Sequence, residues 1–187
     1  MKKIILATAL IAGFVGTASA TGVGPYVGVQ GGYSWMNLGN NTSHDDGLSG
    51  DIHAGYLFPL TNSLSLGPEI GLGSNFYSPK NRGDKLDTNY YVPVMAKLQW
   101  QVNNEVYLFG KAGVTYVSQT LKKAGFSDDN SDWQASFGLG AGYNLSQNLA
   151  LEASYNYVDG DDNDNSNSIK NNTSRFQNVS VGVNYSF

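Results

Sequence analysis

The sequence predicts an all-β protein, an eight-stranded antiparallel up-and-down transmembrane β-barrel. Three observations indicate this fold: apolar and polar residues alternate within eight segments, short and long connections alternate between them, and aromatic residues collect near both segment ends. A spanning helix needs roughly 18 consecutive apolar residues, and no such run follows residue 20. Backbone polar groups must be satisfied internally in a bilayer, so a chain that spans it with strands needs a closed barrel.

Residues 1–20 have the layout of a secretory signal peptide. Lys2 and Lys3 provide a positive start, an apolar run covers residues 4–15, and Ala18-Ser19-Ala20 provides small residues for cleavage. The apolar run is too short for a spanning helix, and a buried N-terminal helix is the alternative. We therefore expect cleavage after Ala20 and one outer-membrane β-barrel domain over residues 21–187.

Composition excludes several classes of function. The chain of 187 residues has a net charge of −4 and offers no basic patch, which argues against nucleic acid as a partner. Cysteine is absent, so disulfides and thiolate chemistry are excluded. The 23 glycines and 12 tyrosines are more than a helical protein would carry. No motif calls for a cofactor, and we expect none.

The eight alternating segments are each about as long as the 9 to 11 residues that a tilted spanning strand needs. They are Pro25–Met36, Leu48–Phe58, Leu64–Tyr77, Thr88–Gln101, Glu105–Val117, Ser131–Asn144, Leu149–Val158 and Phe176–Phe187. The expected short turns are Pro59–Ser63, Asn103–Asn104 and Leu145–Asn148, and the expected long polar loops are Asn37–Gly47, Ser78–Asp87, Ser118–Asn130 and Asp159–Arg175. Short turns at one end and long loops at the other are typical of outer-membrane barrels, with both termini in the periplasm.

The two faces of the strands differ in charge. One parity contains no charged residue, whereas the other holds most glycines and every strand charge. Aromatic residues of the uncharged face gather near both ends and aliphatic residues fill the middle, which matches two membrane interfaces. We therefore expect the uncharged face to meet lipid; a soluble, lipocalin-like carrier with the faces exchanged is the alternative. Parity also requires an odd loop such as residues 102–104, or a bulge, between the fourth and fifth strands.

The C-terminal segment Ser180–Phe187 alternates toward two final aromatic residues. Its residues Gly182, Tyr185 and Phe187 resemble the signal that the barrel assembly machinery reads on its substrates; an ordinary amphipathic strand is the alternative. Residues 21–187 resemble the small eight-stranded outer-membrane family of OmpA-type and OmpX-type barrels and opacity-protein-like surface antigens. The resemblance rests on this C-terminal segment, on the alternation of short turns and long loops, and on the aromatic residues near both strand ends. The resemblance implies the outer membrane of a Gram-negative bacterium, with lipid and lipopolysaccharide as partners. No peptidoglycan-binding domain follows, so we do not expect an anchoring role.

Six inward-facing residues are expected at similar height in the lumen. They are Asp51, His53, Glu69, Lys97, Lys111 and Glu152. An eight-stranded barrel is just wide enough for side chains to fill it, and an unpaired charge there would be costly. We expect Glu–Lys pairs, and the resemblance to OmpA-type barrels implies that Glu69, Lys97, Lys111 and Glu152 form a charged plug. The alternative is a gated, narrow ion path.

The predicted loops offer three weaker hypotheses. Arg82, Gly83 and Asp84 form a tripeptide that could engage a host-cell integrin. Ser43-His44-Asp45-Asp46 could act as a nucleophile system for lipid modification, but neighbouring polar residues in a loop usually only contact solvent. Asp159–Asn165 has spaced carboxylates, yet Lys170 stands where a calcium-binding EF-hand needs Glu. We therefore predict no metal site and no catalysis, and a structural or surface-exposed function, with a small channel, an adhesin and a lipid A-modifying enzyme as successive alternatives.

Overall fold

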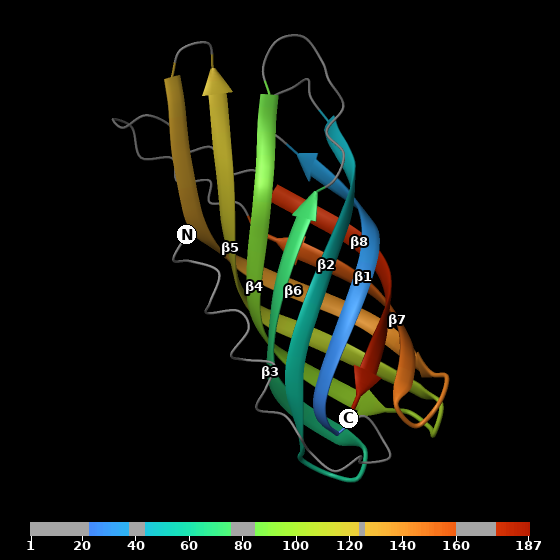
Figure 1. Ribbon diagram of the computed structural model, residues 1–187. Helices are drawn as coiled ribbons and strands as arrows, with labels where there is room; N and C mark the ends of the chain where they lie inside the picture. The colour runs from blue at the N-terminus through green and yellow to red at the C-terminus, as the bar shows by residue number, and fades with distance from the viewer. Residues whose placement is uncertain (1–22, 38–43, 76–84, 124–125, 160–174) are drawn as a thin grey trace.

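The computed structural model describes residues 23–37, 44–75, 85–123, 126–159 and 175–187. These residues form one closed antiparallel barrel in which each strand pairs with its neighbours in sequence and β1 pairs with β8 (Figure 1). The strands are β1 (Gly24–Asn37), β2 (His44–Pro59), β3 (Leu64–Asn75), β4 (Lys85–Gln101), β5 (Val106–Lys123), β6 (Phe126–Asn144), β7 (Leu149–Val158) and β8 (Arg175–Ser186). The predicted fold, an eight-stranded up-and-down barrel, is confirmed. No helix among the described residues is long and apolar enough to cross a membrane.

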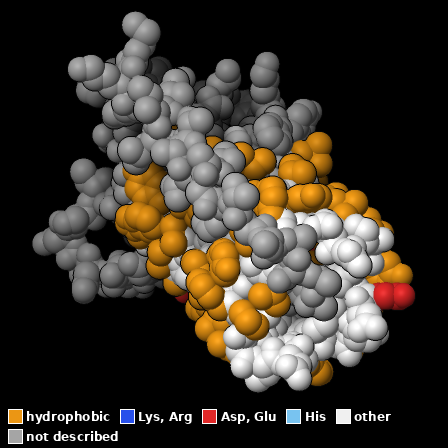
Figure 2. All heavy atoms as spheres, turned by 60° about the horizontal axis from the view of Figure 1, so that its bottom comes forward, with side chains coloured by type: hydrophobic (Ala, Val, Ile, Leu, Met, Phe, Trp, Pro, Cys, Tyr) orange, Lys and Arg blue, Asp and Glu red, His pale blue; other side chains and the backbone are white. Residues whose placement is uncertain are grey.

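The strand faces follow the predicted parity. Large hydrophobic side chains of the uncharged parity are exposed on the outside of the barrel, from Val29 on β1 to Val183 on β8. Exposed aromatic side chains lie near both ends of the wall, with Trp35 and Trp133 toward the loops and Trp100 and Tyr185 toward the turns. Figure 2, viewed toward the turn end, shows hydrophobic side chains along the described wall. Because polar and charged side chains fill the inside, this partition suits a barrel surrounded by lipid.

Three short turns connect the strands at one end of the barrel, and all three share one hydrogen-bonding pattern. Two successive N–H groups donate to one carbonyl: Leu60 and Thr61 to Leu64, Val102 and Asn103 to Val106, and Leu145 and Ser146 to Leu149. The side chain of the second residue, Thr61, Asn103 or Ser146, accepts from backbone N–H groups two and three positions later. Each turn therefore contains a three-residue loop. Between β4 and β5 the odd loop required by parity is residues 103–105, one position later than the expected 102–104.

At the loop end, three strands continue past the barrel wall. β4 begins at Lys85, β5 ends at Lys123 and β6 begins at Phe126, and the three pair throughout this extension apart from a register shift between Thr88 and Tyr90 (Figure 1). The predicted loop Ser118–Asn130 is therefore wrong: except for residues 124–125, outside the described residues, it is a hairpin. The predicted loops Asn37–Gly47 and Ser78–Asp87 are wrong where β2 and β4 enter them, at 44–47 and 85–87.

The extension of β4, β5 and β6 was not predicted because apolar and polar residues do not alternate in its sequence. Residues 118–120 and 127–130 are polar at both parities, so they lack the alternation by which a spanning strand is recognised. The strand segments inside the wall, by contrast, match closely, and β7 has the predicted bounds. The predicted third strand extended to Tyr77, but β3 ends at Asn75, and residues 76–77 lie outside the described residues.

Glycines inside the barrel provide room for large side chains on neighbouring strands. Tyr107 pairs with Gly142, and a Cβ added to Gly142 would lie 2.0 Å from the Tyr107 ring. Phe109 pairs with Gly140 in the same way, with 2.3 Å to its ring. Gly140 and Gly142 are therefore needed for space, because any side chain at either position would overlap the ring on the neighbouring strand.

Candidate functional site

Two lysine–glutamate pairs cross the lumen. Lys97 of β4 donates from Nζ to Glu152 Oε1 of β7, at 2.6 Å. Lys111 of β5 donates from Nζ to Glu69 Oε1 of β3, also at 2.6 Å. Lys97 and Lys111 are register partners on adjacent strands, yet each ammonium group reaches a carboxylate on a strand that is not its neighbour. We call these four residues the charged quartet.

Aromatic residues complete the quartet. The Tyr26 hydroxyl donates to Glu69 Oε2 at 2.7 Å, and the Tyr107 hydroxyl donates to Glu152 Oε1 at 2.8 Å. Lys97 Nζ lies 4.4 Å from the centroid of the Phe109 ring and 4.9 Å from that of Tyr26. Each carboxylate therefore has an ammonium and a phenol as partners, and Lys97 also has cation–π contacts.

Burial makes this pairing necessary. The relative exposure is 1% for Lys97, 3% for Glu152, 5% for Lys111 and 6% for Glu69. A single buried ion in such a place would cost several kcal/mol in desolvation. The two positive and two negative charges cancel, and every one has a direct partner, so the quartet satisfies the requirement that a packed lumen imposes.

Asp51 and His53 form a second group beside the quartet. His53 Nδ1 lies 3.2 Å from Asp51 Oδ1, and His53 Nε2 lies 2.7 Å from Asn184 Oδ1. Gln30 Nε2 donates to Asp51 Oδ2 at 2.7 Å. The His53 ring is also edge-on to the Tyr26 ring, with centroids 6.3 Å apart, and the Tyr26 hydroxyl donates a hydrogen bond to Glu69 of the quartet. The six expected residues thus form two groups, which Tyr26 joins.

Sequence reasoning did not assign the aromatic and amide partners to the site. Tyr26, Tyr107 and Phe109 lie at positions of the charged parity, but parity alone does not show that they contact charges. Their positions near the turn end, at the height of the lysines, were the available signal. Gln30 and Asn184 carried no comparable signal, because amides are common on this face.

Little space remains beside the quartet at the turn end. A cavity of about 20 Å³ lies there, bounded by Lys97, Glu152 and Tyr107 together with Leu57 and Gln99. That volume holds about one water molecule. Within the described ranges, no cluster of three or more His, Asp or Glu residues is arranged to hold a metal ion.

The C-terminal residues lie in β8 or directly after it. A Cβ added to Gly182 would lie 2.3 Å from the Val29 carbonyl oxygen and 2.5 Å from Gln30 Cβ, so packing alone requires glycine there. Tyr185 and Phe187 face outward with their rings in T-shaped contact, centroids 5.2 Å apart. These contacts belong to the outer wall at the turn end.

The loop hypotheses mostly lie outside the described residues. This holds for Arg82, Gly83 and Asp84, for Ser43, and for residues 160–174 with Lys170. The backbone of His44–Asp46 is in β2 and pairs with Trp35–Asn37 of β1, so these residues are in a paired strand and not in a flexible loop.

Comparison with known proteins agrees with the geometry. The sequence matches the family described as outer membrane protein beta-barrel domain over residues 5–187. It is 31% identical over 160 residues to outer membrane protein X of Escherichia coli strain K12, covering 83% of this chain and 88% of that protein. It is 28% identical over 200 residues to the 31 kDa outer-membrane immunogenic protein of Brucella melitensis, covering 88% and 83%.

A solved structure with the same fold is that of Ail, the attachment invasion locus protein of Yersinia pestis. The TM-score is 0.64 at 17% sequence identity, and the match covers 88% of this chain and 99% of that one. The match to the family over nearly the whole sequence, together with the closed barrel and its apolar outer wall, identifies what the chain is. It belongs to the outer-membrane β-barrel family, and its barrel lies in the bacterial outer membrane.

Proposed function

We propose that this barrel has a structural, surface-exposed role and that the charged quartet closes its interior to solutes. The main support for a closed interior is the presence of two buried ion pairs across the lumen, Lys97–Glu152 and Lys111–Glu69, each 2.6 Å long. An eight-stranded barrel leaves room for side chains alone at its centre. A narrow channel would need these contacts to exchange partners, which makes it the runner-up.

The supporting geometry is the way the quartet occupies the cross-section. One ion pair joins β4 to β7 and the other joins β3 to β5, with the Phe109 ring against both ammonium groups at 4.4 and 5.2 Å. An ion entering this layer would have to displace paired charges and an aromatic ring together. Because each charge already has partners, the exchange offers no compensating gain.

Planar-bilayer conductance tests the closure. We expect no steady conductance from the wild type, whereas replacing both Lys97 and Phe109 by alanine should open a path. The matched control replaces Leu98 of β4 and Leu108 of β5, both exposed on the outer wall, by alanine and should stay silent. Steady conductance by the wild type would contradict a closed interior. Silence of the Lys97/Phe109 variant would contradict the assignment of the closure to this layer.

The surface-exposed role is supported by the extension of β4, β5 and β6. These strands pair with one another beyond the first contacts of β6 with β7, at Ala135 and Ser136, so they project past that part of the wall. Segments that project from a rigid scaffold are common binding surfaces. We therefore include a loop-end contact with an external protein in this proposal, and no catalytic step.

Trypsin treatment of intact cells tests which end faces outward. Apart from Lys97 and Lys111, every Lys and Arg after residue 20 lies at the loop end or in the predicted loops: Lys80, Arg82, Lys85, Lys122, Lys123, Lys170 and Arg175. We expect cleavage at these sites in intact cells. Protection in intact cells with cleavage after outer-membrane permeabilisation would show that the loop end faces the periplasm and would refute the surface role.

A further inference from the structure

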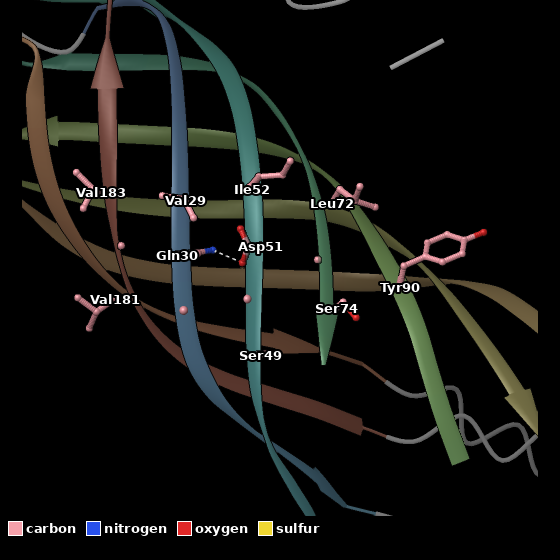
Figure 3. Close-up of a pocket in the computed structure, with 14 residues that line it drawn as sticks. Val29, Gln30, Ser49, Asp51, Ile52, Leu72, Ser74, Tyr90, Val181 and Val183 are labelled. Atoms are coloured by element: carbon pink, nitrogen blue, oxygen red, sulfur yellow. Dashed lines mark hydrogen bonds between the residues drawn. The ribbon is translucent and has the colours of Figure 1, made fainter. Parts of the chain in front are cut away.

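A hollow of about 910 Å³ lies on the outer wall of the barrel, over β8, β1, β2, β3 and the start of β4 (Figure 3). Its floor is the place where Gly31 of β1 pairs with Gly50 of β2. Both residues belong to the outward parity, so two adjacent positions of the wall carry no side chain. The hollow is separate from the quartet, whose residues do not line it.

Apolar side chains surround this floor. Val29, Ile52 and Leu72 stand on the side toward the turns, and Val181 stands on β8, all pointing away from the lumen (Figure 3). Tyr90 on β4 bounds the side across the floor from Val181. On the inner side of the floor, the hydrogen bond from Gln30 to Asp51 joins β1 and β2 behind the glycines. The hollow is therefore an apolar depression in the outer wall, and a side-chain hydrogen bond on the lumen side joins the two strands beneath it.

The depth of the hollow indicates what fills it. Gly31 is two residues before Tyr33 and four before Trp35, the exposed aromatic residues of the loop-end girdle, so the hollow lies in the hydrocarbon half nearer the loops. An empty depression at this depth would forfeit dispersion contacts. A second copy of the barrel does not remedy this, because a symmetric contact would set hollow against hollow. A flexible hydrocarbon chain can enter and cover the glycine floor.

We propose that this hollow is a binding site for an acyl chain of lipid A. The choice of lipid A over phospholipid rests on the proposed outward orientation of the loop end, which places the hollow in the outer leaflet. The acyl chain lies over Gly31 and Gly50, with Tyr90 beside it on β4.

Native mass spectrometry of the full barrel with purified lipid A, and separately with dipalmitoylphosphatidylethanolamine, tests the site. The variant is Gly31→Leu, because a Cβ there meets only the Ser49 carbonyl oxygen at 3.8 Å and the side chain fills the hollow without disturbing the wall. The control is Gly110→Leu on β5, also on the outward parity, where a Cβ meets only the Gly138 carbonyl oxygen at 3.9 Å. A heat-dependent gel shift confirms that both variants fold.

Wild type and Gly110→Leu should retain one lipid A after excess lipid is stripped, and Gly31→Leu should retain about tenfold less, as expected from losing roughly ten close carbon contacts. Equal retention by all three proteins would overturn the site. Stronger retention of the phospholipid would overturn the assignment to lipid A, and trypsin cleavage of intact cells shows independently whether the orientation is at fault. A wild-type dimer abolished by Gly31→Leu would assign the hollow to a second copy instead.

Discussion

Replacing Lys97 by methionine isolates the energetic role of the charged quartet. Methionine retains most of the volume of the lysine stem but removes the ammonium group that bonds Glu152 at 2.6 Å. Glu152, only 3% exposed, would then keep the Tyr107 hydroxyl as its direct partner. Breaking a buried pair by removing one member costs about 3–5 kcal/mol, and the remaining hydroxyl places our expectation near 3 kcal/mol. Two carboxylates would then share Lys111.

Urea titration of the barrel folded into lipid vesicles, followed by the mobility shift of unheated samples, measures this cost. The double variant Lys97→Met/Glu152→Gln removes both charges of the pair and should recover at least about 1 kcal/mol relative to the single variant. Leu98→Met, on the neighbouring lipid-facing position, is the control and should change the free energy of unfolding by less than about 1.5 kcal/mol. The reasoning is refuted if Lys97→Met unfolds like Leu98→Met, or if the double variant is the least stable of the three.

Three further predictions concern the wall, the C-terminus and the loops. Gly142→Val should destabilise the barrel by about 1–3 kcal/mol because its Cβ would enter the Tyr107 ring, whereas Gly110→Val should be tolerated; urea titration compares them. If the final strand is read by the assembly machinery, Phe187→Ser should lower the amount of barrel in outer-membrane fractions while the purified chain still folds into detergent; unchanged amounts would remove that role. Host-cell binding by wild type and Asp84→Glu should differ if the tripeptide engages an integrin, and equal binding would exclude it.

The barrel fold could be predicted from the sequence because the bilayer imposes one simple rule on each strand. Positions that meet lipid must be apolar, so alternation identified the outward residues from Val29 to Val183 and left the charges for the lumen. Beyond the membrane the rule ceases to operate. Strand residues such as Ser127 and Thr120 carry no periodic signal, and their pairing is visible in the backbone register alone.

The partners within the lumen were harder to predict than its residues. Counting residues from the turns placed Lys97, Lys111, Glu69 and Glu152 at one height, but strand order does not show which ammonium meets which carboxylate. Both ammonium groups lie against the Phe109 ring, and Lys97 also lies against the Tyr26 ring. The choice therefore depends on side-chain packing, which alternation does not encode.

The crossing of the two ion pairs has a mechanical consequence. Backbone hydrogen bonds of this barrel join only neighbouring strands, so none of them spans the lumen. The contact from Lys97 to Glu152 joins β4 to β7, two strands that share no backbone pairing. Like charges on register partners would normally repel, but here Lys97 and Lys111 extend to different carboxylates, and the repulsion between them is offset only while both pairs are present. The quartet should therefore behave as one cooperative unit that holds the barrel across its lumen.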